Sequence, residues 1–94
     1  MKIRFYIDPR TGEPHIRNHS VAEAEVEDVL REPGEDRPGR ETSRIAIGQT
    51  EEGRYLKVIY VPDEGRDSVF VITAYDLRGK ELKAFRRRQR RKRR

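Results

Sequence analysis

The sequence contains no cysteine and no tryptophan, and it has a single methionine among its 94 residues. Without cysteine there can be no disulfide bridge, no zinc knuckle and no thiol nucleophile. Its two histidines argue against a closed metal site, so we expect neither a metal nor another cofactor. The sequence also lacks an apolar run long enough for a signal peptide or a transmembrane helix, which predicts a cytoplasmic protein with no membrane partner.

Several common catalytic motifs are absent as well. There is no G-x-x-x-x-G-K-[ST], no G-x-G-x-x-G after a strand, no H-E-x-x-H and no nucleophile elbow, so nothing supports nucleotide or metal catalysis. Hydrophobic residues make up 33% of the chain and charged residues 41%, which is little apolar material for a domain of this size. We therefore expect one domain with a small core, stabilised by a partner or by a second copy of the chain.

Positive charge is concentrated at the C-terminal end. Eight of the 22 lysines and arginines follow Phe85, and none of the 17 acidic residues does. Residues 1–85 thus hold 14 basic against 17 acidic residues, a net charge of −3, and residues 86–94 form a separate basic tail. We predict that the tail grips nucleic-acid phosphates without reading bases, since arginine's forked donors suit phosphate. Its predicted contact residues are Arg86, Arg87, Arg88, Arg90, Arg91, Lys92, Arg93 and Arg94.

The best-supported secondary-structure element is a helix over Val21–Arg31. Ser20 and Glu23 have the S-x-x-E spacing of a capping box, which satisfies two N–H groups at a helix start. An apolar stripe follows at helical spacing, and Pro33-Gly34 ends the helix. The members of this stripe are Ala22, Val26, Val29 and Leu30.

Four segments have the composition of strands. They are Lys2–Ile7, Ser43–Gln49, Tyr55–Val61 and Ser68–Tyr75. The charged segment Pro33–Thr42 is expected to be a loop, and "KELKAFRRRQR" is compatible with a final helix because Leu82 and Phe85 lie one turn apart. The order β-α-β-β-β predicts a single α+β domain, with one helix on a mostly antiparallel four-stranded sheet and a basic C-terminal helix or tail.

A few side chains have the chemistry to act on phosphates. RNA cleavage without metal requires a base for the 2′-OH, a positive partner for the phosphate and an acid for the leaving oxygen, which His, Arg, Lys and Tyr can supply. The candidates outside the tail are His15, His19, Arg40, Arg44, Arg54 and Tyr75.

Strand alternation suggests where two of these candidates lie. If Ile45 and Ile47 face the helix, Arg44 faces the open side of the sheet. If Phe70, Ile72 and Ala74 also form core, Tyr75 shares that open side.

Each candidate also has a purely structural interpretation. His19 can simply pack at the helix entry, and His15 can be an ordinary turn residue. Arg44 can pair with Glu41 or with an acid of the helix. Tyr75 can be a half-buried aromatic at a strand end, and Arg54 a solvated residue.

Three stretches, "NHSVAEAEVEDVLREP", "SRIAIGQTEEGRYLKVIYV" and "VFVITAYDLRGKELKAFRRR", resemble the BrnT-type toxins and, more closely, a neighbouring family of small uncharacterised domains. Both families are grouped with the RelE-like ribonuclease fold. The resemblance spans residues 17–88. His19 and Val21 match the BrnT pattern before the helix, whereas Asn18 and Ser20 depart from it. Tyr75 stands where BrnT-type sequences end the final strand with arginine.

The resemblance implies a metal-independent ribonuclease toxin, blocked by an antitoxin protein, with RNA or the ribosome as target. It makes His19, Arg44 and Tyr75 the candidate catalytic residues. Two alternatives remain open at this point. One is a non-catalytic module of the same fold that binds RNA or the ribosome. The other is a protein-interaction domain whose basic tail only confers solubility.

Overall fold

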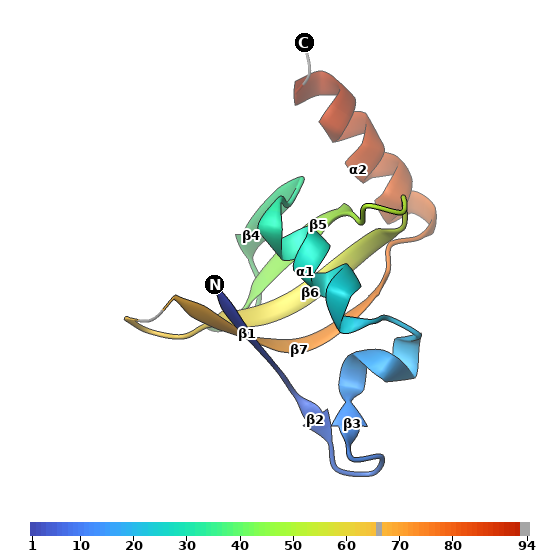
Figure 1. The fold of residues 1–94 in the computed structure, drawn as a ribbon. Coiled ribbons are helices and arrows are strands. Elements are labelled where there is room, and N and C mark those ends of the chain that lie inside the picture. The colour runs from blue at the N-terminus through green and yellow to red at the C-terminus, as the bar shows by residue number, and fades with distance from the viewer. Residues whose placement is uncertain (66, 93–94) are drawn as a thin grey trace.

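The computed structural model describes residues 1–65 and 67–92, and it places five strands in one mixed sheet with the order β1-β7-β6-β5-β4 (Figure 1). The elements are β1 (Lys2–Phe5), β2 (Ile7–Asp8), β3 (Glu13–Pro14), the 3-10 helix η1 (His15–His19), α1 (Glu23–Arg31), β4 (Glu35–Pro38), β5 (Arg44–Gln49), β6 (Tyr55–Pro62), β7 (Ser68–Asp76) and α2 (Gly79–Lys92). The predicted α+β class and the single domain are confirmed. All four predicted strands are present, with β1 parallel to β7 and the other pairs of the large sheet antiparallel.

The sheet has a fifth strand, so the prediction of four strands was wrong. Glu35–Pro38 pairs antiparallel with β5 at the edge of the sheet, inside the segment expected to be a loop. This strand contains no apolar residue, so no alternation reveals it, and only its backbone pairing makes it a strand. Proline at its end is tolerated because an edge strand can spare one N–H donor.

Helix α1 confirms the predicted helix, but its start differs. Ser20 does not cap α1: it has a φ of 57° and ends η1, where its amide donates to the Arg17 carbonyl. The N-cap is Ala22, whose amide donates to Glu25 Oε1 at 3.0 Å. The predicted capping box of Ser20 and Glu23 therefore does not form, because Ser20 is used to end the preceding helix.

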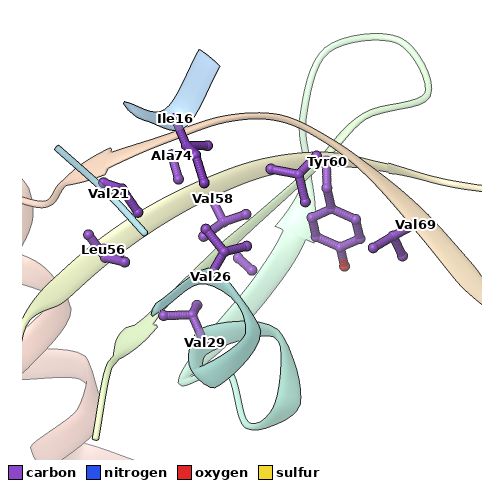
Figure 2. Close-up of a cluster of buried hydrophobic side chains, with 11 residues drawn as sticks. Ile16, Val21, Val26, Val29, Leu56, Val58, Tyr60, Val69 and Ala74 are labelled. Atoms are coloured by element: carbon purple, nitrogen blue, oxygen red, sulfur yellow. The ribbon is translucent and has the colours of Figure 1, made fainter. Parts of the chain in front are cut away.

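Helix α1 covers one face of the sheet and forms the main core with it (Figure 1). Figure 2 shows Val26 and Val29 of α1 opposite side chains of β6 and β7, with Ile16 of η1 closing one end. The sheet residues in this cluster are Ala46, Leu56, Val58, Tyr60, Val69, Val71 and Ala74.

The predicted facing of two strands was wrong. Ala46 and Gly48 of β5 face α1, and a Cβ built on Gly48 would lie 3.3 Å from Val29 Cγ1. The small side of β5 faces α1 because alanine and glycine let the helix approach closely. Ile47 points the other way and packs on Phe85 of α2.

A β-bulge explains the error in β7. Ile59 pairs with Thr73, but the next residue, Tyr60, pairs with Val71, which leaves Ile72 as an extra residue. The bulge changes the alternation, so Val69 and Val71 are buried with Ala74 while Ile72 is exposed. The expectation that Phe70, Ile72 and Ala74 form one core set therefore fails at the bulge.

Helix α2 continues through Lys92 without a break at the predicted boundary between residues 85 and 86. Phe85 is buried and contacts Tyr55 at a ring-centroid distance of 6.1 Å. Arg88 binds the Glu35 carboxylate with two N–H groups, and Gln89 Nε2 donates to the Gly34 carbonyl at 3.2 Å. Within the part of the chain described, neither helix has the length and apolar character needed to cross a membrane.

Candidate functional site

Four rings stand in a row beside β7. Tyr6 lies 6.1 Å from His15, His15 lies 5.5 Å from His19, and His19 lies 5.7 Å from Tyr75, all measured between ring centroids. Both histidines come from η1, four residues apart, and their rings meet edge to face. His19 and Tyr75, two of the residues predicted from sequence, are thus neighbours, and His15 joins them.

Asp8 lies behind His15 and is almost fully buried. Its carboxylate accepts hydrogen bonds from the Arg10 side chain and amide, and from Asn18 Nδ2 at 2.9 Å. Its Oδ2 is also 3.3 Å from His15 Nδ1. These hydrogen bonds, led by that of the Arg10 side chain, hold the pKa of Asp8 well below its usual range, so the carboxylate stays ionised.

Two groups lie within hydrogen-bond distance of His15 Nδ1: Asp8 Oδ2 at 3.3 Å and Asn18 Nδ2 at 3.2 Å. When Nδ1 carries the hydrogen, it donates to Asp8 and leaves Nε2 as a proton acceptor. A carboxylate that orients a histidine and stabilises its protonated form is the arrangement of many general bases. Asp8 was not among the candidates, although the hairpin of β2 and β3 brings His15 back beside it.

Arg54 fixes the position of His19. Its guanidinium donates to Asp76 Oδ1 at 2.6 Å and to Glu25 Oε1 at 2.9 Å. It also donates to the carbonyls of Ser20 at 2.8 Å and His19 at 3.4 Å. One side chain thereby joins η1, α1 and the end of β7. Arg54 therefore has a structural role and is not a solvated surface residue.

Lys57 completes the group next to Tyr75. The two residues are paired across β6 and β7, and Lys57 Nζ lies 6.0 Å from the centre of the Tyr75 ring. Lys57 also forms an ion pair with Glu81 of α2 at 3.0 Å. A positive charge therefore lies beside the tyrosine, at the point where α2 begins.

Arg44 lies elsewhere. Its register partner on β6 is Tyr60, on the face covered by α1, whereas Tyr75 pairs with Lys57 on the opposite face. Arg44 Nε donates to Asp36 Oδ1 at 2.9 Å, and Tyr60 donates to the other oxygen of Asp36. Burial and this hydrogen bond raise the pKa of Tyr60 to about 12. The structure therefore does not bring Arg44 to His19 and Tyr75, and their predicted common surface was wrong.

The basic residues of α2 divide into two groups. Arg88 and Lys92 contact the body, at Glu35 and at the Gly34 carbonyl. Arg86 lies over the Tyr55 ring, 5.9 Å from its centre. Among the described residues, neither Arg86 nor the other exposed arginines of this helix form an ion pair. Those others are Arg87, Arg90 and Arg91, while Arg93 and Arg94 lie outside the described residues.

A cleft of about 620 Å³ lies between the end of α1 and α2, away from the histidines. Arg86 and Arg90 line one side, and acidic residues line another. Its opposing charges and its lack of an imidazole make it a weaker catalytic candidate than the row of rings. No group of three or more His, Cys, Asp or Glu side chains suited to a metal occurs within residues 1–65 and 67–92.

Fold and site together define a small α+β domain with a cluster of acid–base groups at one edge of its sheet. The chain belongs to the family described as "Domain of unknown function (DUF4258)", whose model matches residues 15–76. That match includes both histidines and Tyr75, and it leaves Asp8, Tyr6 and α2 outside. A search of curated proteins and a search of solved structures each found no match.

Proposed function

We propose that the protein is a metal-independent ribonuclease of the RelE/BrnT type. The observation that carries the proposal is the pair of imidazoles 5.5 Å apart, with buried Asp8 behind one and Tyr75 beside the other. Two adjacent imidazoles can hold one proton acceptor and one proton donor, which is what cleavage of RNA at its 2′-OH requires.

In the proposed reaction, His15 Nε2 takes the proton of a ribose 2′-OH. The 2′ oxygen then bonds to the adjacent phosphorus, and the bond from phosphorus to the 5′ oxygen of the next nucleotide breaks. Protonated His19 gives its proton to that leaving oxygen, so the products are a 2′,3′-cyclic phosphate and a 5′-hydroxyl end. Lys57 and the Tyr75 hydroxyl stabilise the charge that develops on the phosphate.

The arginines of α2 support the RNA-binding part of the proposal. Arg86, Arg87, Arg90 and Arg91 are exposed on one helix, whereas residues 1–85 carry a net charge of −3. Attraction to RNA phosphates therefore depends on α2. The same observation favours a second candidate function, a module that binds RNA or the ribosome without cleaving it.

A cleavage assay separates the two functions. The purified protein is incubated in EDTA with a labelled single-stranded RNA and with the same sequence made of 2′-deoxynucleotides. We expect cleavage of the RNA only, with cyclic-phosphate ends detected by mass spectrometry.

His15→Ala and His19→Ala should each lower kcat by about 100- to 10,000-fold, and each should remove one arm of a bell-shaped pH–rate profile. Binding of both oligomers without cleavage would support the module instead. If cleavage occurs in cells, expression without an antitoxin should arrest translation.

A further inference from the structure

An exposed apolar patch adjoins the histidines. Among the described residues, the large hydrophobic side chains that are exposed are Met1, Tyr6, Ile7 and Ile72. Tyr6 follows the last paired residue of β1, and its amide donates to the carbonyl of Val71 at 2.8 Å, so Tyr6 and Ile72 are neighbours across β1 and β7. Tyr6 is 41% exposed, Ile7 50% and Ile72 36%, in a chain that has few apolar residues to leave in water.

The bulge in β7 is the reason that Ile72 belongs to this patch. In the paired register, Phe5 lies opposite Val71 and both side chains face the core under α1. The extra residue at Ile72 interrupts the pairing with β6 and leaves this side chain outward, next to Tyr6. Bulges often redirect a side chain beside a functional site.

The patch continues directly into the proposed active site. The Tyr6 ring is 6.1 Å from the His15 ring, and the His15 amide donates to the Tyr6 carbonyl at 2.9 Å. Arg17, in η1 with the two histidines, is exposed, whereas the exposed Arg4 and Arg10 bind Asp63 and Asp8. An occupant of the patch would thus have a flat apolar part on Tyr6 and negative charge near Arg17.

Two side chains are too few for a stable protein interface, which buries at least about 1,200 Å² in total. They do match the face of one nucleobase, which stacks on aromatic side chains whatever its sequence. Bases inside a duplex are already stacked, so only an unpaired base can use such a surface.

We propose that Tyr6 and Ile72 form a stacking platform for an unpaired base next to the phosphate held by His15 and His19. The platform makes single-stranded RNA the substrate class. This inference rests on the proposed function, which it extends from the reaction to the form of RNA that the site accepts.

The test uses a short 2′-O-methyl RNA, which cannot be cleaved, with 2-aminopurine as the reporter base. The wild-type protein should quench its fluorescence on binding. Tyr6→Ala should bind about tenfold more weakly without quenching, whereas Tyr6→Phe should behave like the wild type. The same oligomer annealed to its complement is the matched control, for which Tyr6→Ala should make no difference.

Equal affinity of Tyr6→Ala and wild type for the single strand, with unchanged circular dichroism, would overturn the platform and favour a protein contact at this patch. Failure of the proposed function gives a different result. In that case Tyr6-dependent binding of the uncleavable strand persists while unmodified RNA stays intact, and the platform stands as a binding site.

Discussion

Replacing Arg54 by alanine should reduce both the stability of the domain and the order of the site. The side chain donates to two carboxylates and to the carbonyls of Ser20 and His19. Alanine removes the one donor that joins these four acceptors and frees the end of η1 that carries His19. We therefore expect cleavage to fall even at temperatures where the variant is still folded.

The expected loss follows from the burial of the group. The side chains of Arg54, Glu25 and Asp76 are 27%, 26% and 27% exposed, between a surface pair and a fully buried one. Exposed ion pairs contribute about 0.2–1 kcal/mol, and hydrogen bonds to charged groups about 1.5–3 kcal/mol. For the whole network we expect a loss of about 2–3 kcal/mol, which lowers Tm by about 10–20 °C in a domain of this size.

The matched control is Arg78→Ala. Arg78 binds the same carboxylate of Asp76 at 2.9 Å, but its side chain is 82% exposed, so its loss should cost less than about 1 kcal/mol. Thermal and chemical denaturation of both variants provide the measurement. If the two variants lose equal stability, the bridging role of Arg54 is refuted.

Acidification gives a second check on Arg54. Hydrogen bonds from Arg54, and then from Arg78, lower the pKa of Asp76 in the folded protein. A carboxyl group with a depressed folded pKa adds stability above its unfolded pKa, about 3.9, and this stability disappears as the pH falls through the folded pKa. The difference in unfolding free energy between wild type and Arg54→Ala should therefore shrink below about pH 4.

Three further predictions concern other residues. Asp8→Asn should lower kcat for RNA cleavage by about tenfold or more with little change in KM, because an amide does not stabilise a protonated His15. Arg44→Ala should cost less than about 1 kcal/mol in chemical denaturation and leave the cleavage rate within about twofold, since its partner Asp36 is a surface residue on an edge strand. Changing four arginines of α2 to glutamine should make the slope of log K against log salt shallower by about 3 in anisotropy titrations with single-stranded RNA, at roughly 0.7 per phosphate contact, and an unchanged slope would assign these arginines to solubility. The four are Arg86, Arg87, Arg90 and Arg91.

The strands and the helix could be predicted from sequence because burial imposes a period on their apolar residues. The fifth strand could not be predicted, since Glu35–Pro38 has three charged residues and a proline, with no apolar alternation, and is held by hydrogen bonds to the backbone of β5. The facing of β7 also could not, because alternation gives no sign of the bulge at Ile72. The bulge exchanges the faces of the residues before it, whereas Tyr75 lies beyond it on the face opposite α1. Arg44 was misplaced for a different reason: β5 turns Ala46 and Gly48 toward α1, and Ile47 away from it.

The site was predicted in part for a similar reason. His19 and Tyr75 were chosen for their chemistry, and the structure makes them neighbours. Asp8 and Arg54 were missed because their roles depend on contacts across the fold: Arg54 is 22 residues from Asp76 and 29 from Glu25 in the chain. Sequence identifies side chains with suitable chemistry, but the partners that orient them are set by tertiary packing.

The positive charges near the histidines are largely occupied by internal partners. Arg10 binds Asp8, Lys57 binds Glu81, and Arg54 binds two carboxylates. The body as a whole is net negative, so its edge attracts a polyanion only weakly. In the proposed function, the exposed arginines of α2 supply that attraction. They bind substrate and transition state equally well, so their loss is expected to raise KM and leave kcat unchanged. In the proposed reaction, the residues around His15 interact with charge that develops only in the transition state, so their substitution is expected to lower kcat.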